Sequence, residues 1–159
     1  MVLGTAGTGK SYLIHCLRRL LGATVRVLAP TGVAAVNIGG ATLHSSLFFL
    51  NVNTFSQLRG PSLQKLQDNF NGIKYIIIDE VSMIGCNMLN AINKRLQQAF
   101  PESADQVFGG CSVMLSDDFG ELTPAGDSRL LHPNIVNPNA VLGNLAYQTS
   151  QECFLSHIM

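Results

Sequence analysis

Charged residues are scarce in this sequence: they make up 13% of its 159 residues, whereas hydrophobic residues make up 47%. A disordered chain needs the opposite balance, so this composition excludes a solvated tail and predicts a globular domain. The length suffices for one domain with a hydrophobic core and is too short for two. No hydrophobic run reaches the roughly 18 to 20 residues that span a bilayer, and the N-terminus lacks the basic segment of a signal peptide. We therefore expect an intracellular protein that does not cross a membrane.

An excess of basic residues is also missing. The sequence has 10 Lys and Arg against 10 Asp and Glu, and its pI is near 6.9. Proteins that hold nucleic acid by themselves usually carry a basic face, because phosphate contacts dominate their affinity. Any contact of this chain alone with DNA is therefore expected to be weak.

Paired cysteines are missing as well. The four cysteines lie far apart, with neither a C-x-x-C pair nor the Cys/His spacing of a zinc site. We expect no structural zinc. Free Cys is among the most buried residue types, so we expect buried free thiols at all four positions, Cys16, Cys86, Cys111 and Cys153.

Hydrophobic β-rich runs alternate with helical segments, which predicts an α/β fold with a parallel sheet and helices on both faces. The predicted strands are 1–3, 24–29, 74–79 and 112–116, the first of them truncated. The predicted helices are 10–21, 33–37, 62–70 and 84–100. Residues 45–55 fit a helix or an irregular segment. We assign residues 1–125 to one domain and leave 126–159 unassigned, with the alternative that they complete the same domain.

The strongest local motif is a phosphate-binding loop of the form G-x-x-x-x-G-K-[ST], here Gly4-Thr5-Ala6-Gly7-Thr8-Gly9-Lys10-Ser11. Its glycines let successive N–H groups face one anion at a helix N-terminus. Lys10 would reach the β- and γ-phosphates of a nucleotide, and the hydroxyl of Ser11 would bind Mg²⁺. The loop follows a predicted strand and opens a predicted helix, which is the context that the motif requires. A Gly-rich turn without a ligand is the alternative.

A pair of carboxylates ends the clearest predicted strand, in the run Ile76-Ile77-Ile78-Asp79-Glu80. Asp79 would help to hold Mg²⁺, often through water, and Glu80 would orient and deprotonate an attacking water. An acid pair at a strand end is often only a solvated turn. In an open parallel sheet, however, ligands bind at the carboxyl ends of the strands, where both motifs fall. The two motifs together predict ATP binding and hydrolysis with Mg²⁺.

Three further segments narrow the class of ATPase: residues 29–35 (Ala-Pro-Thr-Gly-Val-Ala-Ala), 39–45 (Gly-Gly-Ala-Thr-Leu-His-Ser) and 79–83 (Asp-Glu-Val-Ser-Met). In this order after the phosphate loop, they resemble the Pif (petite integration frequency) family of superfamily 1 DNA helicases. The related RecD-like helicases share parts of the pattern. The resemblance covers roughly residues 2 to 125.

The resemblance implies a three-layer RecA-like fold and hydrolysis of Mg-ATP coupled to 5′ to 3′ movement along single-stranded DNA. It also implies roles in DNA repair, recombination and telomere maintenance, and a nuclear or mitochondrial location if the organism is eukaryotic. The residues that would approach the DNA strand are Pro30, Thr31, Gly32, Thr42 and His44. Hydroxyls and backbone N–H groups suit phosphate contact, and a histidine can stack on a base. For His44 the alternative is a histidine hydrogen-bonded within the fold.

The sequence departs from the family in three respects: one altered motif, the first strand and the second domain. In the altered motif, Asp117 stands where the family has a glycine, Glu121 where it has a glutamine and Thr123 where it has a proline. An ionised Glu121, although it occupies a catalytic position, can only accept hydrogen bonds and adds negative charge beside a polyanion, and Asp117 is expected to strain a backbone angle that glycine allows. The first strand lacks its upstream half. Nothing after Gly126 resembles the second RecA-like domain, whose arginines stabilise the transferred phosphoryl group, so we expect this chain to be a fragment.

Three hypotheses follow. The leading one is the ATP-binding domain of a helicase that acts only as part of a longer protein. The second is a helicase remnant that binds nucleotide without turnover, which the substitutions at Asp117 and Glu121 favour. The third is a P-loop ATPase or kinase acting on a small molecule, which would transfer phosphate to a metabolite and ignore single-stranded DNA.

Overall fold

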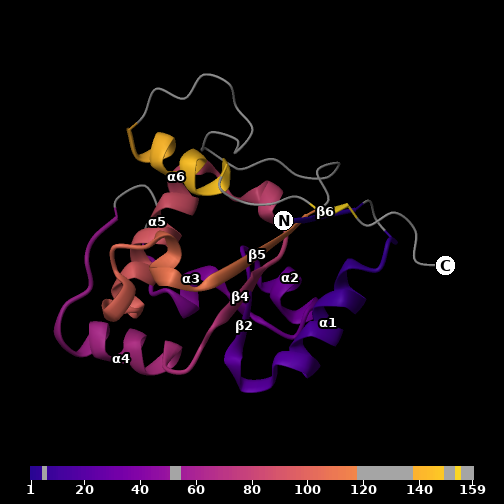
Figure 1. Ribbon diagram of the computed structural model, residues 1–159, viewed down its shortest axis with the longest axis horizontal. Helices are drawn as coiled ribbons and strands as arrows, with labels where there is room; N and C mark the ends of the chain where they lie inside the picture. Colours follow the sequence, from indigo (N-terminus) through magenta and orange to yellow (C-terminus); the bar gives the residue numbers. More distant parts are fainter. Residues whose placement is uncertain (5–6, 51–54, 118–137, 149–152, 155–159) are drawn as a thin grey trace.

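A computed structural model describes residues 1–4, 7–50, 55–117 and 138–148, together with the backbone of 153–154. Its strands are β1 (Val2–Leu3), β2 (Val25–Ala29), β3 (Ala41–Thr42), β4 (Tyr75–Ile78), β5 (Ser112–Asp117) and β6 (Cys153–Phe154). They form one six-stranded sheet in the order β3-β2-β4-β5-β1-β6, and every pairing is parallel (Figure 1).

Helices cover both faces of this sheet. The α-helices are α1 (Lys10–Leu21), α2 (Gly32–Asn37), α3 (Leu43–Ser46), α4 (Gly60–Phe70), α5 (Cys86–Ala99) and α6 (Pro138–Gln148). The 3-10 helices are η1 (Gly22–Thr24), η2 (Val81–Met83), η3 (Pro101–Ser103) and η4 (Val107–Gly110). Figure 1 shows α1 and α2 on one side of the central strands and α4, α5 and α6 on the other. The predicted α/β fold with three layers is confirmed.

Alternation along the central strands divides the core into two parts, because successive side chains of a strand point to opposite faces. Val27 and Ile77 pack with Ile14 of α1 and Ala35 of α2. The other face is larger, and its buried residues from the strands are Leu28, Ile76, Ile78 and Leu115. Burial of each such side chain stabilises the fold by about 1.5–3 kcal/mol. The run of three isoleucines in β4 is therefore explained by a strand that is covered on both sides.

The predicted element limits hold within two residues. Helix α1 spans the predicted residues 10–21, and the N–H of Gly22 donates to the carbonyl of Arg18 as a C-terminal cap. Helix α4 begins at Gly60 rather than at residue 62. Helix α5 is shorter at both ends than the predicted 84–100, because Ile84 is extended and Phe100 leaves the helical region.

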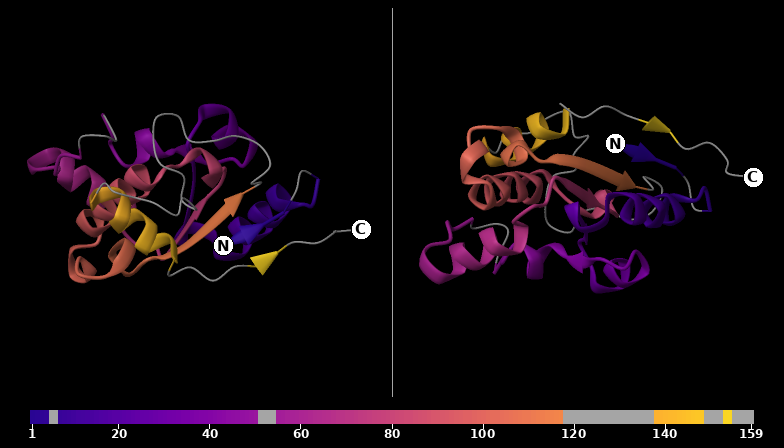
Figure 2. Two further views of the ribbon diagram at one scale, coloured as in Figure 1. Left: turned by 90° about the horizontal axis from the view of Figure 1, so that it is seen from above. Right: turned by 60° about the horizontal axis from the view of Figure 1, so that its bottom comes forward.

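Two parts of the architecture were not predicted. Within the ambiguous segment 45–55, α3 ends at Ser46; the preceding strand β3 pairs with β2 through Ala41 and Leu28. In the tail, α6 packs on α5, and β6 pairs with β1 in the register Leu3↔Phe154. Figure 2 shows the yellow arrow of β6 beside the indigo β1 in both views. Short strands and helices of this kind form through partners distant in the sequence, which periodicity does not report.

The described cysteines meet the expectation of burial only in part. Cys86 is buried and Cys111 is half-buried, but Cys16 is exposed on α1. The prediction of a buried thiol is therefore wrong for Cys16; the side chain of Cys153 lies outside the described residues. Among the described helices, none combines the length and the hydrophobicity needed to cross a bilayer.

Candidate functional site

The phosphate-binding loop joins β1 to the N-terminus of α1. Gly7 and Gly9 have φ angles of 79° and 86°, in the left-handed region where a side chain is strained. Gly9 is the N-cap of α1 and provides no side-chain acceptor, so the first N–H groups of a 12-residue helix remain available to an anion. Thr5 and Ala6 lie outside the described residues. The described part of the loop has the geometry that the motif predicts.

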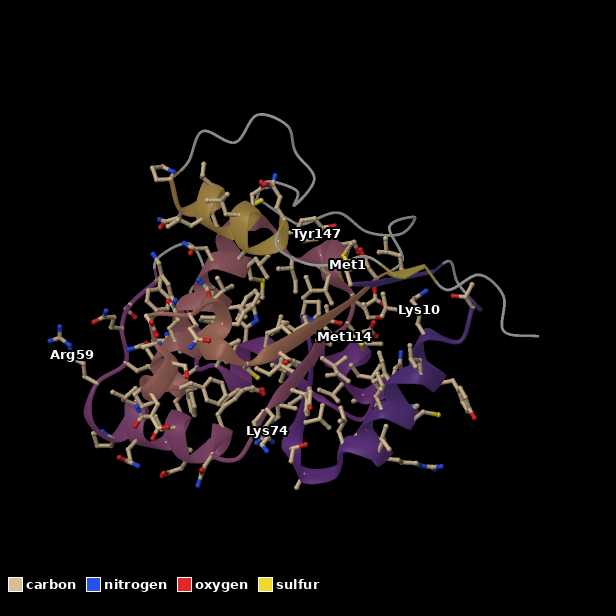
Figure 3. All side chains as sticks on the ribbon, in the orientation of Figure 1. Met1, Lys10, Arg59, Lys74, Met114 and Tyr147 are labelled. Atoms are coloured by element: carbon tan, nitrogen blue, oxygen red, sulfur yellow. The ribbon has the colours of Figure 1, made fainter. Side chains whose placement is uncertain are left out.

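Lys10 is the first residue of α1 and is half-buried. Its Nζ donates a hydrogen bond to the carbonyl oxygen of Gly4 at the start of the loop. The ammonium group therefore lies along the loop whose N–H groups would bind the same anion. Ser11 is exposed in the first turn of the helix. Figure 3 shows Lys10 near the N-terminal residue Met1, while Lys74 lies at the opposite end of the sheet.

The two predicted acidic residues follow β4 directly. Asp79 is 7% exposed, and its N–H donates to the carbonyl of Leu28 at 3.0 Å, which continues the β2–β4 ladder by one residue. Glu80 is half-buried with φ 57° and ψ 48°. A left-handed conformation costs a non-glycine residue roughly 1–2 kcal/mol, and such residues cluster at functional sites. The backbone thus turns sharply at Glu80, at the carboxyl edge of the sheet.

Asp117 adds a third carboxyl group at this edge. It is the last residue of β5, pairs in register with Leu3, and is 1% exposed. Its conformation is that of a strand residue and its φ is not positive. The backbone strain expected from the replacement of a glycine is therefore absent, which corrects that prediction. What remains is the carboxyl group itself, one strand away from the phosphate loop.

A magnesium site at this edge would use Ser11 and Asp79. Among the described residues, no three His, Cys, Asp or Glu side chains gather as a metal cluster. Mg²⁺ bound beside a nucleotide needs no such cluster, because it takes one or two protein oxygens, phosphate oxygens and water. An exposed hydroxyl at Ser11 and a carboxylate after β4, which β5 separates from β1, fit this ligand set. Glu121 lies outside the described residues.

The predicted DNA-contacting residues lie at the same edge, at the other end of the strand order. Thr31 is the N-cap of α2, and its Oγ1 accepts a hydrogen bond from the N–H of Ala34 at 3.2 Å. Thr42 caps α3 in the same way through the N–H of Ser45, also at 3.2 Å. The hydroxyl of Thr31 still has its O–H to donate to a phosphate, whereas the hydroxyl of Thr42 lies 2.7 Å from Ser45 Oγ, which itself donates to the carbonyl of Thr42. Pro30 and Gly32 flank Thr31 at the end of β2.

His44 is exposed, whereas the adjacent Leu43 is fully buried. The ring of His44 meets the ring of Phe49 edge to face, with centroids 6.2 Å apart. Within the described residues its side chain makes no hydrogen bond, so the alternative of a histidine hydrogen-bonded in the fold finds no partner there. The ring is therefore open to a ligand on one side and supported by an aromatic residue on the other.

The order β3-β2-β4-β5-β1 arranges these groups along one edge. The phosphate loop follows β1, and the acid pair follows β4, between the two ends of this order. At the other end, Thr42 ends the outer strand β3, and His44 follows it. The structure thus brings Lys10 and Asp79 to a common edge and places His44 at its far end. The acid pair therefore lies between the phosphate loop and the predicted DNA-contacting residues.

Two further residues of this region, Arg95 and Phe49, were not identified from the sequence. Arg95 lies on α5 and is 2% exposed, with its guanidinium over the rings of Phe49 and Phe55. Burial lowers the pKa of the Arg95 guanidinium below its ordinary value. One sequence feature could have indicated that Arg95 is buried: it is a charged residue that lies between Ile92 and Leu96 on the apolar face of a predicted helix.

Comparison with known proteins gives the family. Residues 1–137 match the family model described as PIF1-like helicase. The ATP-dependent DNA helicase RRM3 of Saccharomyces cerevisiae is 35% identical over 129 residues, which cover 76% of this chain and 18% of that protein. The ATP-dependent DNA helicase PIF1 of Candida albicans is 36% identical over 132 residues, covering 76% of this chain and 14% of that protein. The chain therefore spans less than a fifth of these relatives' length.

Solved structures agree. Bacteroides Pif1 bound to single-stranded DNA is similar with a TM-score of 0.69 and 32% identity, over 78% of this chain and 29% of that one. Pif1 from Bacteroides in complex with ADP-AlF3 and single-stranded DNA gives a TM-score of 0.75 at 26% identity, over 99% of this chain and 38% of that one. A family model that matches most of the chain, and relatives more than 30% identical, bear out the resemblance of the motifs. The chain belongs to the PIF1-like helicase family.

Proposed function

We propose that this chain is the nucleotide-binding domain of an ATP-driven DNA helicase, in which hydrolysis of Mg-ATP drives 5′ to 3′ movement along single-stranded DNA. The observation that carries this proposal is the common sheet edge, where the loop after β1 and the acid pair after β4 lie with a single strand, β5, between them. Family membership supports it. Roles in DNA repair, recombination and telomere maintenance belong to the same proposal for the whole protein.

Each residue of the edge has a defined task in hydrolysis. The N–H groups that follow Gly7 and Gly9 surround the phosphates, and Lys10 moves from the carbonyl of Gly4 onto the β- and γ-phosphates. Ser11 and Asp79 would hold Mg²⁺. Bound Mg²⁺ would neutralise charge that develops on the transferred phosphoryl group. Glu80 orients the attacking water in line with the transferred phosphoryl group and accepts a proton from that water.

DNA contact is proposed for the opposite end of the edge. The hydroxyl of Thr31 donates to a phosphate while it caps α2, and the ring of His44 stacks on a base. The hydroxyl of Thr42 contacts a phosphate by exchanging its hydrogen bond with Ser45 Oγ. With a net charge of zero, the chain alone binds DNA weakly. A second RecA-like domain is the proposed partner that supplies the other DNA-binding surface and the arginines of the transition state.

The test is ATP turnover by the purified chain with Mg²⁺, with and without single-stranded DNA. Lys10→Ala removes the charge that would contact the phosphates, and turnover is expected to fall by about 100-fold or more. Lys74→Ala is the matched control, because Lys74 is exposed at the opposite end of the sheet. Its turnover should equal that of the unchanged chain.

The result separates the hypotheses. DNA-stimulated turnover that Lys10→Ala abolishes and Lys74→Ala preserves supports the helicase domain. Turnover that transfers phosphate to a metabolite and ignores DNA would favour the small-molecule kinase instead. ATP binding without turnover favours the second candidate.

That second candidate is a remnant that binds nucleotide and turns over none. Asp117 is the observation that favours it, because a buried carboxyl group in register with Leu3 stands one strand from the phosphates. Like charges at close range oppose binding in a site of low dielectric. Restoring turnover by Asp117→Gly combined with Glu121→Gln would identify these two positions as the cause of the loss.

A further inference from the structure

Arg95 is a buried cation in the middle of an apolar helix face. It is 2% exposed, and its neighbours on the same face of α5, Ile92 and Leu96, are fully buried. A charged group removed from water is costly unless its hydrogen bonds are replaced. The guanidinium donates from Nη1 to Oε1 of Gln98 at 2.7 Å and from Nη2 to the carbonyl of Ser56 at 3.1 Å. Among the described residues these acceptors are neutral, so charge pairing does not explain its position.

Two aromatic rings supply the remaining contact. The guanidinium carbon lies 4.9 Å from the centroid of Phe55 and 5.5 Å from that of Phe49. A desolvated cation over an aromatic face is attracted more strongly than an exposed one. Arg95 therefore links Phe49 to Phe55, which is six residues later in the sequence.

Gln98 lies three residues further along α5 and adds to the contacts of Arg95, which together form a clamp on the backbone of residues 56–58. Its Oε1 accepts from the N–H of Leu58 at 3.3 Å, and its Nε2 donates to the carbonyl of Leu58 at 3.2 Å. Arg95 and Gln98 thus fix the backbone at Ser56 and Leu58 from a single helix. Backbone held by buried hydrogen bonds opens less often than backbone exposed to water.

Phe49 connects the clamp to His44. The N–H of Phe49 donates to the carbonyl of His44 at 3.1 Å, and the two rings meet edge to face at 79°. Phe48 between them has a φ of 53°, which fixes the turn that brings the rings together. Since Phe49 is 7% exposed and His44 is exposed, Phe49 is the buried support of an exposed ring.

We propose that Arg95 is a positioning residue for single-stranded DNA: it orders Phe49 and thereby sets the place of His44. This inference rests on the proposed DNA contact of His44. Arg95 itself is too deeply buried to touch a phosphate. Its loss should therefore weaken DNA binding through the position of His44, while the phosphate loop, which belongs to β1 and α1, keeps its affinity for ATP.

The experiment compares Arg95→Met with Arg26→Met. Arg26 has the same kind of contacts elsewhere: its guanidinium lies 5.7 Å from the ring centroid of Phe70, and Nη2 donates to the carbonyl of Asn69. Both variants lose one positive charge and one hydrogen bond to a backbone carbonyl. Arg95→Met loses two cation–π contacts and a hydrogen bond to Gln98, and Arg26→Met loses one cation–π contact. Binding of a fluorescent oligothymidylate is measured by anisotropy at several salt concentrations, and ATP binding by calorimetry.

Arg95→Met should raise the Kd for the oligonucleotide roughly tenfold and leave the Kd for ATP unchanged. Arg26→Met should change neither, even where it lowers the thermal midpoint. The salt dependence of DNA binding should keep its slope, because a lost phosphate contact would reduce that slope by about 0.7. Equal loss of DNA and ATP affinity in Arg95→Met would show a merely structural role and overturn the proposal.

Two further variants test the route through Phe49. Arg95→Lys keeps the cation over the rings and should restore part of the DNA affinity. Phe49→Leu should weaken DNA binding as Arg95→Met does, and the double variant should be no weaker than either single one, since both break the same connection. Additive effects would mean that Arg95 acts by another route.

Hydrogen exchange provides a readout that needs no DNA. In Arg95→Met the amides of Leu47 and Phe49, which donate to Leu43 and His44, should exchange faster, with no change in α1. If exchange is unaltered, Arg95 does not order this segment and the proposal falls. If exchange is faster but the unchanged chain binds no oligonucleotide, the DNA contact of the proposed function is what fails.

Discussion

The backbone N–H of Gly4 donates a hydrogen bond to the carbonyl oxygen of Asp117 at 3.3 Å. This bond extends the β1–β5 ladder by one residue and fixes the point at which the phosphate loop leaves the sheet. The side chain of Asp117 is thereby held one strand from the loop that would bind a triphosphate. The residue that anchors the loop also contributes a carboxyl group to its surroundings.

Asp117→Asn should therefore strengthen nucleotide binding. The change keeps the backbone and the volume of the side chain but removes a negative charge from the neighbourhood of the phosphates. We expect the affinity for Mg-ATP to rise about tenfold, which corresponds to about 1.4 kcal/mol. Repulsion between one carboxylate and a phosphate in a partly buried site can supply an energy of this size. Calorimetric titration with Mg-ATP measures it. Asp105→Asn, at an exposed position in the turn before η4, is the control; an equal gain there would point to net charge rather than to location.

Glu80→Gln should separate binding from turnover. The amide cannot accept a proton from water, so turnover is expected to fall by about 10²- to 10⁴-fold, while the phosphate loop and its affinity for ATP stay intact. Single-turnover kinetics and calorimetry measure the two quantities. Glu102→Gln changes an exposed glutamate in η3 and should leave both unchanged. Loss of ATP affinity in Glu80→Gln would show that the carboxylate takes part in nucleotide binding and would contradict a role confined to the attacking water.

Gly143→Ala should loosen α6 from α5. A methyl group at Gly143 would lie 1.9 Å from the carbonyl oxygen of Cys86, so the two helices must move apart. Overpacking of this kind costs about 1–3 kcal/mol, which thermal or urea unfolding would detect. Gly32→Ala is matched, because nothing lies within 4 Å of the added methyl group. Comparable destabilisation by both changes would argue against close packing at Gly143.

Thiol labelling should distinguish the cysteines. In a Cys153→Ser background, Cys16 is exposed and should react first, and Cys16→Ser should remove the fast phase. Burial raises the pKa of the Cys111 thiol from 9.0 to about 11, so at pH 8 this group stays protonated and unreactive. Its labelling rate should rise as the pH passes through 9 to 11, because only then does thiolate form. Fast labelling of Cys111 at pH 8 would contradict this.

The fold could be predicted as far as local sequence carries it. The apolar run before Asp79 predicted β4, and the glycine at position 22 predicted the end of α1. Asp117 could be identified as a departure from the family, but its conformation could not, because a strand at that position accepts aspartate without strain. Helix α6 and strand β6 could not be predicted from local sequence, because contacts with partners far along the chain define them.

What the sequence by itself determined is the chemistry of the phosphate loop and the acid pair, because each is a run of adjacent residues whose spacing fixes its geometry. Only the tertiary structure decided that Arg95 lies between Phe49 and Phe55 and that Phe49 supports His44. These contacts join residues up to 46 positions apart, as from Phe49 to Arg95. A charged residue in a helix has no preferred partner until the sheet and its covering helices bring one within reach.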